Sequence, residues 1–210
     1  MRTIIRSFAA VLVAVFCLVS ASGAQERLLP IPADKMTEAQ KKLAADFAKG
    51  RGIELDGPWI TFVRSPELMT RTLALSECIR SKSVIEPRVA ELVVLVVSRE
   101  WTQQFEWAMH YRNALKAGLK REIADAIAEA RRPDAMAADE TIAYDVATEI
   151  LQTKRVSDTT WSRAVSRFGE QGIVELLATI GYFNYLSVVM NAARTAPPEG
   201  GPGPLKRYPD

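Results

Sequence analysis

Residues 87–119 read PRVAELVVLVVSREWTQQFEWAMHYRNALKAGL, and this stretch decides the fold. Proline is favoured at the first position of a helix, so Pro87 marks the beginning of one. The run from there to Val97 is apolar on most faces, which is typical of a central, buried helix. A second helix is expected from about Thr102 to Ala117, ending at Gly118. The stretch therefore predicts two consecutive helices, the first of them at the centre of the protein.

The second of these helices holds His110, the only histidine in the chain. Glu106 precedes it by one helical turn, and residues at that spacing share a helix face, so the two side chains are expected to touch. A neighbouring carboxylate favours the imidazolium form and can fix which ring nitrogen carries the proton. Such a pair is prepared for proton transfer near neutral pH. The alternative is a contact on the helix surface without a catalytic role.

Glu91 lies within the aliphatic run, where an unpaired charge would be very costly. An acid in this position either has a partner or has a raised pKa, and both conditions suit a proton shuttle. The alternative is that Glu91 pairs with Arg88, one turn earlier, at the polar edge of its helix.

Three further side chains near His110 are candidates for contacts with a small molecule. Gln103 is expected on the same face one turn before Glu106, where its amide can form a hydrogen bond. Trp101 and Trp107 flank the site and could form an apolar wall around it, although tryptophans more often belong to the core.

The remaining sequence also has helical signals, and no alternating pattern of strands is present. A capping box at 37–40 begins a helix that is expected to run to about Lys49. Ser65 is expected to cap a helix from Pro66 to about Arg80, and Asp139 to cap one that includes 139–155. Further helices are expected at 120–132, 157–169 and 173–194, whereas 59–63 is expected to be a short extended or irregular piece. The fold class is therefore predicted to be all-α.

The two ends of the chain differ from the rest in composition. Residues 1–24 combine a basic start, a short apolar run and small residues before Gln25, as in a secretory signal peptide; a retained anchor is the alternative. One domain is expected over 25–196, followed by a Pro- and Gly-rich tail at 197–210. No later stretch is expected to span a membrane, so we expect a soluble, secreted or periplasmic protein that does not contact a membrane after cleavage.

Charge and cysteine usage exclude several classes of function. The chain has 27 basic and 25 acidic residues, and removing Arg2 and Arg6 with the leader leaves a formal balance of zero. Such a balance does not favour nucleic acid as a partner. Cys17 belongs to the leader, so Cys78 remains alone, without a disulfide or dithiol partner. At helical spacing from Leu75, it is expected to be a small core residue.

The segment 87–127 resembles the core of the carboxymuconolactone decarboxylase family, whose superfamily includes the alkylhydroperoxidase D-like proteins. The resemblance extends more loosely over 57–68, 144–158 and 168–193. It implies an all-helical bundle of about seven to eight helices that assembles as a trimer, hexamer or dimer. In the peroxidase branch the site is an acid, two cysteines and a histidine. These positions correspond here to Glu91, Gln103, Glu106 and His110, so both cysteines are missing.

This departure disfavours a dithiol peroxidase, because peroxide reduction needs a thiolate and a resolving partner. The resemblance instead implies a cofactor-free, decarboxylase-like acid/base enzyme acting on a small carboxylated lactone or related acid. His110 would donate the proton, Glu106 would orient it, and Glu91 would relay protons. No metal is expected, because one histidine and one acid are too few ligands. A non-catalytic small-ligand-binding protein and a peroxidase acting through Cys78 are the alternatives.

Several more distant residues are candidates for binding the substrate of such an enzyme. Arg64 or Arg112 could anchor a carboxylate. Asn184 and Asn191, which share a face of the last helix, could line the pocket; the alternative is that they face solvent or a neighbouring subunit.

Overall fold

The computed structural model describes residues 25–206, and within them it contains eight α-helices and one 3₁₀ helix. The 3₁₀ helix is η1 (Ala33–Lys35). The α-helices are α1 (Glu38–Arg51), α2 (Pro58–Phe62), α3 (Pro66–Ser81), α4 (Pro87–Glu100), α5 (Gln104–Lys116), α6 (Arg121–Ala128), α7 (Ala138–Thr153) and α8 (Asp158–Ala193). No β-strand occurs in this part of the chain, so the all-α prediction is confirmed. The predicted signal peptide, 1–24, lies outside the described residues.

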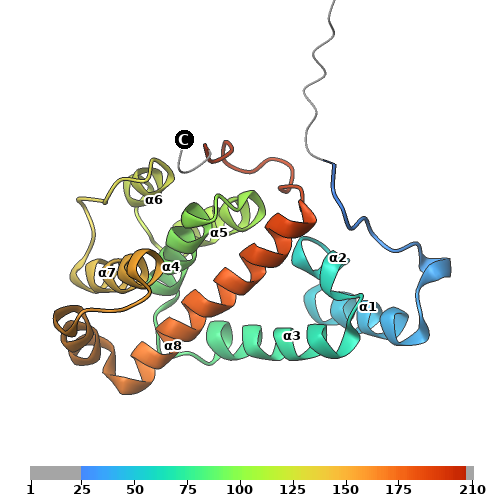
Figure 1. Cartoon of the computed structure of the whole chain (residues 1–210), viewed down its shortest axis with the longest axis horizontal. Coiled ribbons are helices and arrows are strands. Elements are labelled where there is room, and N and C mark those ends of the chain that lie inside the picture. The colour runs from blue at the N-terminus through green and yellow to red at the C-terminus, as the bar shows by residue number, and fades with distance from the viewer. Residues whose placement is uncertain (1–24, 207–210) are drawn as a thin grey trace, which may run out of the picture.

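Helix α4 forms the centre of the bundle and packs against α5, α6, α7 and α8 (Figure 1). Its apolar run explains this position, because a helix that is apolar on most faces is stable only when other helices surround it. Leu92, Val93, Leu95 and Val97 are completely buried. Helix α5 returns alongside α4, and the two helices together hold the residues that the sequence singles out.

Helix α8 is long but interrupted at Gly169, which has φ 72° and ψ 172°. The two helices predicted at 157–169 and 173–194 are therefore present and continue into one another across this kink. By length and apolarity α8 could cross a membrane, contrary to the expectation that no such stretch follows the leader. Half of its most apolar window is buried inside the protein.

Four local expectations are wrong. Residues 59–63 are mostly helical, because Pro58 opens α2, and Trp59 and Phe62 enter the core. The Ser65 side chain forms no capping hydrogen bond. Asp139 does not cap α7, because its carboxylate instead binds Arg88. Cys78 is exposed rather than in the core.

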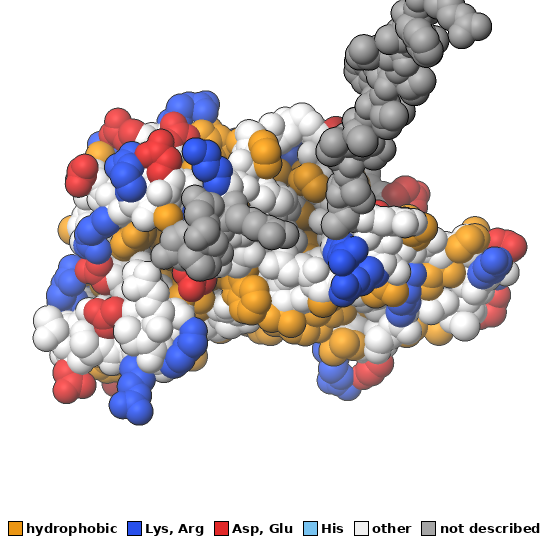
Figure 2. Space-filling model, turned by 45° about the horizontal axis from the view of Figure 1, so that its top comes forward, with side chains coloured by type: hydrophobic (Ala, Val, Ile, Leu, Met, Phe, Trp, Pro, Cys, Tyr) orange, Lys and Arg blue, Asp and Glu red, His pale blue; other side chains and the backbone are white. Residues whose placement is uncertain are grey.

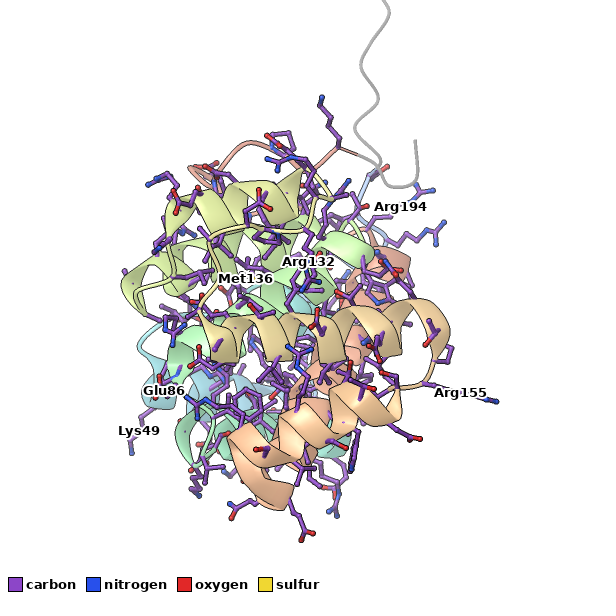
Figure 3. All side chains as sticks on the ribbon, turned by 90° about the vertical axis from the view of Figure 1, so that its left-hand side faces the viewer. Lys49, Glu86, Arg132, Met136, Arg155 and Arg194 are labelled. Carbon is purple, nitrogen blue, oxygen red and sulfur yellow. The ribbon has the colours of Figure 1, made fainter. Side chains whose placement is uncertain are left out.

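Ion pairs tie α7 to its neighbours on the surface that Figure 3 shows. Asp145 on α7 binds Arg132, which is labelled in Figure 3, at 2.6 Å and Arg163 of α8 at 2.9 Å. Basic and acidic side chains are also interspersed over much of the face in Figure 2, in keeping with the balanced charge of the sequence. This balance leaves no broad basic surface there for a phosphate backbone.

The segment after α8, predicted to be a tail, packs against α5 as far as it is described (Figure 1). Leu205 is buried, and its backbone N–H and C=O both bind the Gln104 side-chain amide at 2.9 Å. Arg99 donates a hydrogen bond to the Lys206 carbonyl, and Gly201 lies against Ala108. The segment therefore covers the beginning of α5 rather than extending into solvent.

Gly57 is predicted to tolerate no side chain. Its φ is +48°, and a Cβ built there would lie 2.3 Å from the ring of Phe105, at the beginning of α5. Gly57→Ala should lower the free energy of unfolding by about 2 kcal/mol in urea titrations, through strain and overpacking. Gly52→Ala is the matched control, because Gly52 has φ +70° but open space around it. Equal losses in the two variants would show that the clash with Phe105 contributes nothing.

Candidate functional site

His110 lies between two carboxylates. Its Nδ1 is 2.6 Å from Glu91 Oε2, and its Nε2 is 3.1 Å from Glu106 Oε2. Glu91 comes from α4, whereas Glu106 and His110 lie one turn apart on α5. The side chains of His110 and Glu106 are almost completely buried, and that of Glu91 is 14 % exposed. The three residues therefore form one hydrogen-bonded unit, the Glu91–His110–Glu106 triad.

This geometry decides between the alternatives left open by the sequence. Arg88 binds Asp139 and Glu140, not Glu91, and Glu91 binds His110 instead. The Glu106–His110 pair is not a surface contact, because both side chains lie inside the protein.

The connection from α4 to α5 holds Glu106 in place. Thr102 has φ +47°, which is rare for a β-branched residue and costs free energy. This conformation brings the Gln103 side chain to the beginning of α5, where its oxygen accepts hydrogen bonds from the backbone N–H groups of Phe105 and Glu106. The Gln103 amide nitrogen donates to Asn191 of α8. Gln103 thus fixes the first turn of α5 from which Glu106 extends.

The charge state of His110 follows from its surroundings. Burial alone would lower the pKa of His110, but the carboxylates of Glu91 and Glu106 outweigh burial and raise the pKa to about 9. At neutral pH the ring is therefore an imidazolium that donates one hydrogen bond to each carboxylate. The edge-on ring of Phe183, with its centroid 4.8 Å away, restricts the imidazole from a third side.

Glu106 and His110 line a cavity of about 820 Å³ between α1, α2, α3, α5 and α8. Apolar walls come from the aromatic residues Phe47, Trp59, Phe105 and Phe183. A cavity of this size, whose lining combines aromatic walls with polar and charged side chains, is suited to a small organic molecule.

Several polar residues of the cavity were not identified from the sequence, among them two arginines and a tyrosine. Arg51 at the end of α1, Arg80 on α3 and Tyr182 on α8 all line it. Burial raises the pKa of Tyr182 to about 12, so its hydroxyl is a neutral hydrogen-bond donor at physiological pH. These residues are distant from His110 in sequence, and no local pattern connects them with it.

The residues expected to bind substrate lie elsewhere. Gln103 caps α5, and Trp107 is buried in the core beside Tyr111. Arg64 donates hydrogen bonds to the carbonyls of Ile60 and Leu29. Asn184 binds Trp101 and the Ile180 carbonyl. None of these four candidates lines the cavity, and neither do Trp101, Arg112 and Asn191.

No group of three or more histidine, cysteine or acidic residues suited to a metal ion occurs in the described part of the chain. Cys78, on α3, does not line the cavity either. The chemistry that the cavity residues can supply is therefore proton transfer by Glu106 and His110 and binding of negative charge by the two arginines.

Comparisons with known proteins agree with this architecture. The sequence model of the Carboxymuconolactone decarboxylase family matches residues 66–149, which include α3 to α6 and most of α7. None of the curated proteins matches the chain at a significant level.

Several solved structures share the fold. One is an alkylhydroperoxidase AhpD core protein, an uncharacterized peroxidase-related protein from Ralstonia eutropha JMP134, with a TM-score of 0.69 and 12% identity over 83% of this chain and 93% of that chain. Another peroxidase-related protein, from Silicibacter sp. TM1040, has a TM-score of 0.67 and 15% identity over 87% and 97% of the two chains. The debrominase Bmp8 in complex with 2,3,4-tribromopyrrole has a TM-score of 0.66 and 14% identity over 84% and 94%. At these identities the likeness shows the fold alone.

Proposed function

We propose that this chain, which belongs to the superfamily of carboxymuconolactone decarboxylases and alkylhydroperoxidase D-like proteins, is an acid/base enzyme of the decarboxylase type. Its substrate is a small carboxylated lactone or a related organic acid. The observation that carries the proposal is the buried triad at the wall of the cavity, in which one imidazolium is held between Glu91 and Glu106.

Decarboxylation needs a proton at the carbon that loses carbon dioxide. The bond between that carbon and the carboxylate breaks, carbon dioxide leaves, and the electron pair remains on the carbon. Both ring nitrogens of His110 are already bound to carboxylates, so the proton reaches the substrate by way of Glu106, which also lines the cavity. The Nε2 proton of His110 passes to Glu106 and from there to the carbon, and the triad then regains a proton from solvent. This scheme differs from the expectation from the sequence, in which His110 is the donor, Glu106 orients it and Glu91 relays protons. Here Glu106 delivers the proton to the carbon, His110 resupplies it and Glu91 anchors the ring.

A thiol peroxidase is the weaker candidate. Gln103 and Glu106 occupy the positions at which the peroxidase branch has its two cysteines, and neither side chain can form a thiolate. Cys78 is exposed and lies outside the cavity, so it has no access to the triad.

The proposal includes a place of action and an assembly. Residues 1–24 are proposed to be a cleaved signal peptide, so the enzyme would act outside the cytoplasm. A homo-oligomer is proposed as well, because Leu68 and Leu75 of α3 and Val174 and Val188 of α8 are exposed large apolar side chains.

A screen of small carboxylic acids and lactones tests the function. We expect at least one compound to be converted with release of carbon dioxide, and His110→Gln to reduce this turnover at least about 100-fold while circular dichroism shows an intact fold. Ligands that raise the melting temperature without forming product would indicate a binding protein instead. Peroxide consumption that disappears in Cys78→Ser would indicate the peroxidase.

A further inference from the structure

Two arginines meet in the part of the cavity formed by α1 and α3. Arg51 ends α1, Arg80 lies one residue before the end of α3, and both line the same cavity as Glu106 and His110. Among residues 25–206, neither guanidinium forms an ion pair or a hydrogen bond with another side chain. Two like charges that share a cavity without a bound acid are unfavourable unless an anion joins them.

The surroundings of Arg51 hold its guanidinium in a defined place. It lies over the ring of Phe47 at 5.2 Å and over the ring of Trp59 at 5.1 Å, measured to the ring centroids. The two ring centroids are themselves only 5.8 Å apart, so both rings lie on one side of the guanidinium. Its remaining N–H donors are left for a planar acceptor. Burial, and then the charge of Arg80, lower the pKa of Arg51, so a negative charge between the two arginines would be stabilising.

The acids of the same cavity do not fill this role. Asp46 binds Lys42 at 2.5 Å, and Glu77 binds Lys82 at 3.0 Å, so both are already paired at the surface. Asp56 influences Arg51 only through space, without forming an ion pair with it. Glu106 is engaged by His110.

We propose that Arg51 and Arg80 form a carboxylate-binding subsite, distinct from the Glu91–His110–Glu106 triad. The carboxylate held there is not the group that reacts. The rest of the ligand, a planar or apolar group, lies against the aromatic walls of the cavity. The ligand is therefore an organic acid rather than an inorganic anion. As a statement about the substrate class, this inference rests on the proposed function. Binding of a carboxylate at the two arginines does not depend on turnover.

Binding of benzoate and of its neutral isostere benzamide, measured by titration calorimetry, tests the subsite. The wild-type protein should bind benzoate at least about tenfold more tightly than benzamide, because only the carboxylate can accept charge-assisted hydrogen bonds from both arginines. Arg80→Gln should remove most of this preference. Arg71→Gln is the matched control, because Arg71 is an exposed residue of the same helix that binds Glu67 and lies outside the cavity.

The outcomes separate this subsite from the proposed chemistry. Arg51 also packs on two aromatic rings, so the binding data for Arg51→Gln need the melting temperature of that variant as a check on its fold. Arg80 is exposed and has no such ring contact, so Arg80→Gln does not need this check. Glu106→Gln should bind benzoate at least as tightly as the wild type even if it converts no substrate. Equal affinity for benzoate and benzamide, no measurable benzoate binding, or an unchanged preference in Arg80→Gln would each overturn the subsite.

Discussion

Glu106→Gln lowers kcat at least about 100-fold on whichever acid or lactone the protein converts, without loss of the fold. Glutamine has nearly the same volume as glutamate, and its side-chain oxygen can still accept the hydrogen bond from His110 Nε2. It cannot take up and release a proton. The loss should therefore be in kcat, measured by the release of carbon dioxide, with a much smaller change in KM.

A control on another carboxylate distinguishes this loss from a general effect of charge. Glu67 of α3 lies outside the cavity, and its side chain is 73% exposed. The Glu67→Gln variant should therefore be as active as the wild type. An active Glu106→Gln enzyme, retaining more than about half of the wild-type kcat, would show that the proton reaches the substrate by another route.

The stability of the protein should decrease between about pH 6.5 and pH 9. The pKa of His110 is raised from 6.5 to about 9 in the folded protein. A raised histidine pKa contributes stability that is fully present below the unfolded pKa and is lost as the pH rises through the folded pKa. The rise from 6.5 to about 9 corresponds to about 3 kcal/mol in the free energy of unfolding. Urea titrations at a series of pH values measure it.

Two controls assign the pH dependence to His110. Cys78→Ser removes the exposed free thiol of the described chain and leaves the triad unchanged, so the decrease should persist in this variant. Since the chain has one histidine, its ring resonances can be followed by NMR without overlap from another imidazole. A midpoint near 6.5 for these resonances, or a free energy of unfolding that is constant from pH 6.5 to 9, would contradict the buried imidazolium.

The parts of the fold that could be predicted from the sequence are those that depend on local signals. The capping box at Thr37 and the prolines that begin α3 and α4 gave helix positions close to the observed ones. α2 was missed, because a five-residue helix has too few turns to show a period. Its Trp59 and Phe62 are held by packing in the core rather than by local preference.

The site shows the same division between local and long-range information. The Glu106–His110 contact follows from one helical turn, and Glu91 was identified because a buried acid needs a partner. Which face of a helix lines the cavity depends on tertiary packing. Trp107 therefore points into the core although Glu106, its neighbour in sequence, lines the cavity.

On α8 the cavity is lined by Tyr182, Phe183 and Leu186, whereas Asn184 is turned away by the helical rotation between successive residues. Arg51 and Arg80 could not be found from the sequence at all. Each lies in the last turn of its helix as an ordinary exposed arginine would, and only the packing of α1 and α3 brings them to the same cavity.

The double engagement of the imidazole also determines its reactivity toward added reagents. A ring with a hydrogen on each nitrogen has no lone pair to offer, so near neutral pH it should react only slowly with an acylating reagent such as diethyl pyrocarbonate. For the same reason, it should not ligate nickel on an affinity resin. The sole histidine of the chain should therefore give little reaction in the tests commonly used to detect a histidine. Inactivation by an acylating reagent would indicate modification of lysines or of Cys78 instead.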